Sequence, residues 1–129
     1  MSGIEITKEF TFDSAHYLPG HPGKCAAIHG HTYRMQVTLA CDPACMTGGM
    51  VLDFGDLSRC VHDEIIRRVD HKLLNEVLGY VPTAENMVID FFGRLKSVID
   101  SLPLGGGKRV RLASVRLWET PTSYAEYRG

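Results

Sequence analysis

The sequence has no run of apolar residues that approaches the length of a membrane-spanning helix, about 20 residues. Its first five residues, Met1-Ser2-Gly3-Ile4-Glu5, lack the charged and apolar regions of a signal peptide. We therefore expect a cytoplasmic protein that has no membrane partner.

An excess of charge of either sign is also missing. The chain has 14 Lys and Arg residues and 15 Asp and Glu residues, which gives a formal net charge of −1 at pH 7. This balance does not indicate a nucleic-acid-binding surface, so we expect no nucleic-acid partner. Internal repeats, low-complexity tracts and linkers are missing too, and we place a single domain at residues 1–129.

Cysteine is sparse, with four residues in the chain. In a cytoplasmic protein we expect these thiols to be reduced, and a chain of this length can bury a core without disulfides. Cys41 and Cys45 stand in a turn segment that offers no further ligands at suitable spacing, so we assign them no metal. Cys60 is interpreted as a small apolar residue of a helix.

Two stretches alternate between apolar and polar residues with the period of two that is typical of β-strands. In residues 4–14, Ile4, Ile6, Phe10 and Phe12 share one face, interrupted by Lys8, and Glu5, Thr7, Glu9 and Thr11 share the other. In residues 29–40, Tyr33, Met35, Val37 and Leu39 share the apolar face. The loop between them, 17–28, is too long for a tight hairpin turn. Two more strands are expected at 109–119 and 123–128.

Two helices are expected between the second and third strands. The first begins after Asp53, which has the side chain of an N-cap, and ends near Arg68. The second begins after Thr83, another N-cap residue, and its apolar face extends to Leu102. A flexible glycine turn follows at 105–107. The order ββααββ predicts an α+β domain whose helices cover one face of an antiparallel sheet.

Three histidines fall on the apolar face of the first two strands. His29 and His31 are two positions apart, so in a strand they point to the same side. The parity of the first strand continues through Ser14 to His16. If the two strands pair antiparallel, the three imidazoles converge, and three histidines with an open fourth position are typical of a catalytic zinc ion. His21 lies in the loop, off this parity, and is left out.

A His-x-His pair alone is a weak signal, because many strands carry two histidines without a metal. The third histidine and a nearby thiol strengthen the zinc interpretation. That thiol belongs to Cys25, four positions before His29, and it is the candidate base or nucleophile because Lys24 and a zinc ion would both favour its thiolate form. The sequence leaves open the alternative of a loop cysteine with no role.

Two further positions carry groups suited to chemistry or binding. His71 follows Asp70 in the connector 70–75, and a carboxylate can orient an imidazole for proton transfer. Because adjacent side chains do not easily bond to each other, we expect Asp70 to act through the backbone geometry or a third group. Glu119 continues the apolar face of the third strand, where two parallel N–H donors of a ligand would suit a carboxylate. The alternatives are a polar turn and a strand-end carboxylate that reaches water.

A set of short motifs occurs along the chain in an order that is specific in combination. The motifs are Phe12-Asp13-Ser14-Ala15-His16, Cys25-x₃-His29-Gly30-His31, Leu52-Asp53-Phe54, Asp70-His71-Lys72-x-Leu74-Asn75, Pro82-Thr83-Ala84-Glu85-Asn86 and Trp118-Glu119-Thr120. Together they resemble the 6-pyruvoyltetrahydropterin synthase and 6-carboxytetrahydropterin synthase family over nearly the whole chain. The resemblance implies the tunnelling fold, in which ββααββ subunits join their sheets into barrels, and a homohexamer built from two trimers.

The resemblance also implies a role for each matching residue. These roles are zinc ligands for His16, His29 and His31, catalytic base for Cys25, proton relay for Asp70 and His71, anchor of the pterin ring for Glu119, and further substrate binding for Thr83 and Glu85. In such a site Zn²⁺ ligates the side-chain hydroxyls of the substrate and polarises the adjacent carbon–hydrogen bonds.

Within the family, the short Cys-x₃-His-Gly-His spacing resembles the enzymes that form 6-carboxytetrahydropterin. It implies conversion of 7,8-dihydroneopterin triphosphate to 6-carboxy-5,6,7,8-tetrahydropterin, with release of acetaldehyde and triphosphate, on the route to queuosine and other deazapurines. Two alternatives remain open, a 6-pyruvoyltetrahydropterin synthase and a non-catalytic tunnelling-fold protein that binds pterins. The thiol of Cys25 argues against the second, because binding alone needs no thiol.

Overall fold

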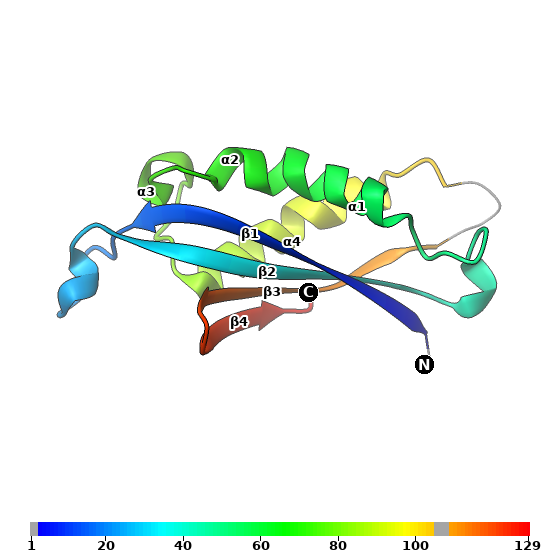
Figure 1. Ribbon diagram of the computed structural model, residues 1–129, viewed down its shortest axis with the longest axis horizontal. Coiled ribbons are helices and arrows are strands. Elements are labelled where there is room, and N and C mark those ends of the chain that lie inside the picture. The colour runs from blue at the N-terminus through cyan, green and yellow to red at the C-terminus, as the bar shows by residue number, and fades with distance from the viewer. Residues whose placement is uncertain (1–2, 105–108) are drawn as a thin grey trace.

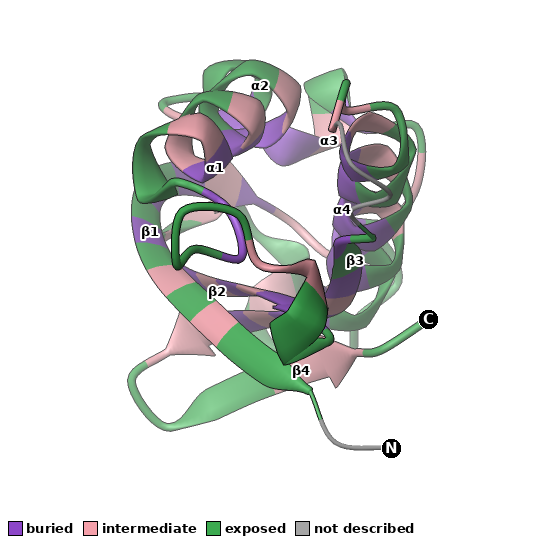
Figure 2. Ribbon diagram, turned by 90° about the vertical axis from the view of Figure 1, so that its right-hand side faces the viewer, coloured by how far each residue is buried: buried purple, intermediate pink, exposed green. Residues whose placement is uncertain are grey.

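Four antiparallel strands form one sheet in the order β1-β2-β3-β4 in the computed structural model, which describes residues 3–104 and 109–129 (Figure 1). The strands are β1 (Ile4–His16), β2 (His29–Cys41), β3 (Arg111–Thr120) and β4 (Ser123–Tyr127). The helices lie over one face of this sheet (Figure 2). The predicted α+β class is therefore confirmed, and each strand lies within two residues of its predicted bounds.

β1 and β2 form a long hairpin whose register places two histidines opposite each other. Their pairing is unbroken from Ile4 opposite Cys41 to His16 opposite His29. The loop that joins them contains one short 3₁₀ turn, η1 (Lys24–Ala26), and a second such turn, η2 (Pro43–Cys45), follows β2. Because the strands end in histidine where the loop begins and ends, the register sets two imidazoles side by side.

The first helical segment runs from Phe54 to Val69, but its middle turn is π-helical. It comprises α1 (Phe54–Val61), η3 (His62–Ile66) and α2 (Arg67–Val69). The predicted N-cap is confirmed, since the Asp53 carboxylate accepts a hydrogen bond from the backbone N–H of Gly55 at 2.7 Å. The wider turn accommodates Ile65 and Ile66, which are consecutive in the sequence and both buried.

Two more helices complete the layer, α3 (Leu74–Val77) and α4 (Ala84–Asp100). α3 was not predicted, because residues 70–75 were expected to be an irregular connector. The fully buried side chain of Leu74 holds it against the core. The predicted cap of α4 is confirmed, since the Thr83 hydroxyl accepts a hydrogen bond from the backbone N–H of Asn86 at 3.2 Å.

The core lies between the sheet and the helices (Figure 2). The rings of Phe12 and Tyr33 stack with their centroids 4.9 Å apart, and Phe91 of α4 meets Phe12 edge-on at 6.4 Å. All three side chains are at most 2% exposed, so they contribute both apolar burial and favourable ring geometry. Tyr33 is the next residue after His31 on the same face of β2, so this group of three aromatic rings lies beside the histidines.

The opposite face of the sheet is polar and exposed, as predicted from β1. Glu5, Thr7, Glu9 and Thr11 are all exposed there. On the neighbouring strands the guanidinium of Arg34 lies 3.8 Å from the ring centre of Trp118, which covers that aromatic surface with a cation.

The glycine turn predicted at 105–107 lies outside the described residues. Within 3–104 and 109–129, no helix is long and apolar enough to cross a membrane.

Candidate metal centre and active site

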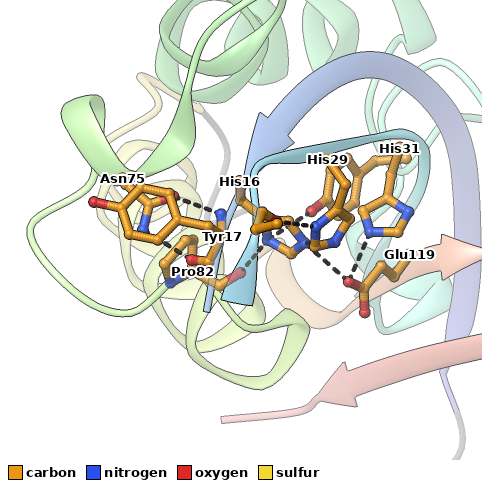
Figure 3. A network of polar contacts seen from close by, with 9 residues as sticks. His16, Tyr17, His29, His31, Asn75, Pro82 and Glu119 are labelled. Atoms are coloured by element: carbon orange, nitrogen blue, oxygen red, sulfur yellow. Dashed lines mark hydrogen bonds and ion pairs between the residues drawn. The ribbon is translucent and has the colours of Figure 1, made fainter. Parts of the chain in front are cut away.

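The loop end of the β1–β2 hairpin brings three imidazoles together, as the sequence predicts (Figure 3). The ring centroids of His16 and His29 are 4.6 Å apart, those of His16 and His31 are 5.0 Å apart, and those of His29 and His31 are 4.9 Å apart. Glu119 near the end of β3 joins them, and one donor atom from each of the four residues lies within 4.8 Å of all the others.

Backbone carbonyls fix the tautomers of two of these histidines. The Nδ1 of His16 lies 2.8 Å from the carbonyl oxygen of Pro82, and the Nδ1 of His29 lies 2.8 Å from that of Ala27. A carbonyl oxygen only accepts, so each Nδ1 carries the proton and each neutral ring keeps a lone pair on Nε2. These two Nε2 atoms are 3.0 Å apart. Two facing lone pairs at that distance repel each other unless a cation lies between them.

The third imidazole supports the same conclusion. The Nε2 of His31 is buried and forms no hydrogen bond, although Glu119 Oε1 lies 3.1 Å away. Buried polar atoms without hydrogen bonds are rare in folded proteins, and a metal ion is one of the partners that accounts for them. The cluster of His16, His29, His31 and Glu119 is therefore one that could bind a metal ion.

The members of the cluster shift one another's pKa values. The contact with His16, whose Nε2 donates a hydrogen bond to the carboxylate when the ring is protonated, lowers the pKa of the Glu119 carboxyl against the opposing effect of burial, and the charge of His31 lowers it further. Burial is the largest influence on His16 and acts to lower its pKa, but the contacts with Glu119 and the Pro82 carbonyl together raise it. Burial is the main reason why the pKa of His31 is lowered, which favours its neutral form. Metal binding needs unprotonated imidazoles.

A side-chain clamp that the sequence did not predict holds the end of β1 in place (Figure 3). The amide of Asn75 accepts a hydrogen bond from the backbone N–H of Tyr17 and donates one to the Tyr17 carbonyl, both at 2.9 Å. On the other side of His16, the backbone N–H of Ala15 donates to the Lys72 carbonyl at 3.0 Å. His16 is therefore fixed through both of its chain neighbours. Asn75 was recognised only as part of a motif.

Asp70 and His71 form a turn that docks on the outer edge of β1. The Asp70 carboxylate accepts a hydrogen bond from the backbone N–H of Asp13 at 3.0 Å, and this bond is the main reason why the pKa of Asp70 is lowered. Asp70 Oδ1 also lies 3.0 Å from the Nδ1 of His71. The expectation that these adjacent side chains do not contact each other is therefore wrong. His71 has a φ of 59°, a left-handed conformation that folds its ring back toward its neighbour.

Two surface hollows each contain a member of the cluster together with other predicted site residues. His71 and Lys72 line one hollow of about 580 Å³ together with His31. Glu85 and Glu119 line another of about 460 Å³. His71 thus lines a hollow that contains His31, and the carboxylates of Glu85 and Glu119 line a second hollow that touches the cluster through Glu119.

Two further predicted site residues lie in the β1–β2 loop and at the start of α4. Cys25 is in η1, half-buried, and its thiol lies outside the four-residue cluster. Thr83 uses its hydroxyl to cap α4. Cys41 and Cys45 carry free thiols. His21 accepts a hydrogen bond from Gly23 N at 2.9 Å within the loop.

Comparison with known proteins places these features in a family. The family model described as 6-pyruvoyl tetrahydropterin synthase matches residues 5–129. A 6-carboxy-5,6,7,8-tetrahydropterin synthase of Haemophilus influenzae is 36% identical over 96% of this chain and 98% of its own, and one from Synechocystis is 39% identical over 95% and 91%. The structure of Caenorhabditis elegans 6-pyruvoyl tetrahydropterin synthase aligns with a TM-score of 0.80 at 30% identity and covers 100% of this chain and 97% of that one. The chain belongs to the 6-pyruvoyl tetrahydropterin synthase family.

Proposed function

We propose that the chain, as one domain over residues 1–129, is a zinc-dependent 6-carboxy-5,6,7,8-tetrahydropterin synthase. Its substrate is 7,8-dihydroneopterin triphosphate, and its products are the 6-carboxytetrahydropterin, acetaldehyde and triphosphate. The supporting observation is the convergence of His16, His29, His31 and Glu119 in a chain that matches bearers of that enzyme name over nearly its full length. The reaction would serve queuosine and other deazapurine biosynthesis.

Zn²⁺ is the ion that this donor set suits best. Imidazole nitrogens and a carboxylate oxygen are ordinary zinc ligands, and three histidines are one of the ligand sets found in catalytic sites. Bound there, Zn²⁺ would supply Lewis-acid polarisation of the side-chain hydroxyls of the substrate. The carbonyls of Pro82 and Ala27 orient the rings of His16 and His29 so that their Nε2 atoms face each other and would face the ion.

The hollow that contains Glu85 and Glu119 is the proposed place for the pterin ring. A pterin presents a 2-amino group beside N3–H, and a carboxylate can accept both donors in parallel. Glu85 stands in the first turn of α4, and its cap residue Thr83 fixes the start of that helix beside the hollow. The two acidic side chains together make the hollow selective for a ligand that donates hydrogen bonds.

Proton transfer falls to Cys25 and to the Asp70–His71 pair. Cys25, in the loop that precedes His29, takes a proton from the substrate side chain as the general base. Asp70 holds the His71 ring by the 3.0 Å contact, so that the imidazole can pass a proton to or from the hollow that it shares with His31. The active assembly in this proposal is a homohexamer, a dimer of trimers.

One incubation tests the function directly. The purified, zinc-loaded protein is mixed with 7,8-dihydroneopterin triphosphate, and acetaldehyde, triphosphate and pterin products are measured. Release of acetaldehyde in equal amount to triphosphate supports the proposal. Triphosphate without acetaldehyde identifies a 6-pyruvoyltetrahydropterin synthase, the second candidate, which the likeness to the Caenorhabditis elegans structure favours. Binding of the pterin with no product contradicts both and indicates a non-catalytic protein.

A further inference from the structure

Glu119 is placed differently from a residue that only binds a ligand ring. Its Oε1 atom lies 3.2 Å from the Nε2 of His16 and 3.1 Å from the Nε2 of His31 (Figure 3). The same oxygen thus contacts the metal-facing nitrogens of two of the three imidazoles. The backbone brings it there after an irregularity in the β3–β4 pairing between Trp118 and Thr120.

The spacing of these donor atoms matches one coordination shell. Donors that sit about 2.0–2.1 Å from a tetrahedral zinc ion are about 3.3–3.4 Å from one another. The His16–His29 nitrogen pair is 3.0 Å apart, and the two contacts of Glu119 Oε1 are 3.2 and 3.1 Å. Glu119 Oε1 would therefore serve as the fourth donor beside the three imidazoles.

The side chain of Glu119 is also more exposed than those of His16 and His31. His16 and His29 are each fixed by a backbone carbonyl on the ring nitrogen that faces away from the cluster. The side chain of Glu119 is 29% exposed and lines two hollows, one shared with Arg34 and Trp118 and one shared with Glu85. A ligand that enters either hollow reaches this carboxylate before it reaches the buried imidazole of His16.

We propose that Glu119 is the fourth metal ligand while no substrate is bound, and that a pterin carrying side-chain hydroxyls displaces it. The step is a ligand exchange: a carboxylate oxygen leaves the ion, a hydroxyl oxygen of the pterin takes its place, and no covalent bond changes. The released carboxylate is then free to accept the ring N–H donors beside Glu85. This inference rests on the proposed function, because it takes the pterin from it.

The exchange has a chemical consequence. A zinc ion with four protein ligands is closed to water, whereas one with three is open to a reacting ligand. Glu119 would therefore keep the ion closed until a suitable ligand arrives. The hydroxyls of that ligand replace the carboxylate on the ion, and its ring N–H groups donate hydrogen bonds to the released carboxylate. A polyol without a pterin ring supplies hydroxyls but no N–H donors for the carboxylate, so it displaces Glu119 from the ion poorly.

The test uses metal binding and spectroscopy instead of turnover. Zn²⁺ affinity is measured by competition with a chromophoric chelator, and Co²⁺-loaded protein gives a visible spectrum that reports the coordination number. Glu119→Gln should lose about 10- to 100-fold in Zn²⁺ affinity, the range for removing a partner of a metal site, and should shift the Co²⁺ spectrum. Glu85→Gln is the matched control, because it removes a carboxylate from the same hollow that does not touch the imidazoles, and it should change neither.

Displacement is tested on the unaltered sequence. 7,8-Dihydroneopterin, which has the hydroxyls but no triphosphate to release, should change the Co²⁺ spectrum of the wild type, and glycerol at the same concentration should not. An unchanged spectrum with bound dihydroneopterin overturns the displacement, and equal metal affinity of wild type and Glu119→Gln overturns the fourth-ligand role. A protein that shows both effects yet releases no acetaldehyde keeps this inference and loses the proposed function.

Discussion

The three imidazoles are held to different degrees by the rest of the chain. His16 is 0% exposed and bound by the Pro82 carbonyl, and His29 is bound by the carbonyl of Ala27 within its own loop. The Nε2 of His31 has no hydrogen bond, and its 3.1 Å contact is with Glu119, inside the cluster itself. His31 is therefore the position at which metal binding can be tested with the least damage to the fold.

His31→Ala should abolish stoichiometric zinc binding. The variant keeps two imidazoles and only the displaceable carboxylate of Glu119, so the three-histidine set that holds the ion is incomplete. Metal analysis of the purified variant checks this, with His21→Ala as the control because that imidazole accepts a hydrogen bond from Gly23 within its own loop and is not a member of the cluster. A His31→Ala protein that binds one zinc ion as tightly as the wild type would contradict the assignment.

Cys25→Ser tests the proposed base with the smallest change of shape. A serine hydroxyl has nearly the size of a thiol but is a far weaker base at neutral pH. We expect zinc content and pterin binding to persist while acetaldehyde release falls roughly 10²–10⁴-fold, the usual contribution of a general base. The rates are compared at equal zinc content.

Another thiol of the chain provides the control for that experiment. Cys60 is half-buried on α1 and has free sulfur, so Cys60→Ser should keep the wild-type rate. If Cys25→Ser retains more than about a tenth of the rate, its role as base is wrong. His71, which opens onto the same hollow as His31, would then be the better candidate.

At the scale of elements, the parts that follow from local patterns were predictable. The period of two in β1 and β2 predicts both the strands and the shared face of His16, His29 and His31, because one register satisfies all of them. The caps at Asp53 and Thr83 follow from side-chain chemistry alone and are confirmed.

What the sequence could not predict depends on contacts between distant segments. α3 exists because Leu74 is buried against elements far away in the chain, and the π-helical turn because Ile65 and Ile66 both face the core. Glu119 reaches the imidazoles only through the pairing of β3 beside β2 and an irregularity at its end. None of these has a local pattern that indicates it.

The Asn75 clamp yields a prediction at this scale. Asn75→Ala removes both hydrogen bonds to Tyr17 and should lower the free energy of unfolding by about 1–3 kcal/mol, because two half-buried backbone groups lose their partner. Zinc affinity should fall as well, since Tyr17 adjoins His16. Urea unfolding of zinc-loaded and chelator-treated protein measures both effects.

A second substitution at the same position separates the two hydrogen bonds. Asn75→Asp keeps the acceptor for the Tyr17 N–H and loses the donor to the Tyr17 carbonyl, so its cost should lie between those of the wild type and Asn75→Ala. Equal zinc affinity in all three proteins would mean that the clamp stabilises α3 without positioning His16.

At the scale of the whole molecule, the sheet and the helical layer leave surface that suits further association. Both outer strands of the sheet have an edge that pairs with no other strand among the described residues, apart from a single bridge between Ala15 and Leu73 on β1. Long unpaired edges are usually covered in native proteins. Large apolar side chains are exposed as well, among them Ile28 at 65%, Phe54 at 50% and Ile89 at 52%.

These features support the prediction that the protein is a homohexamer in solution. Joining the free edges of β1 and β4 between neighbours would pair them and enclose the polar face of Glu5, Thr7, Glu9 and Thr11, which then lines a solvated barrel. Sedimentation at micromolar concentration should give six times the chain mass of 14.3 kDa. Specific activity should fall on dilution as the hexamer dissociates, because the proposed sites lie near subunit boundaries. A monomer with full activity at that concentration would refute the assembly and would require Cys25, His71 and the imidazole cluster to act within one chain.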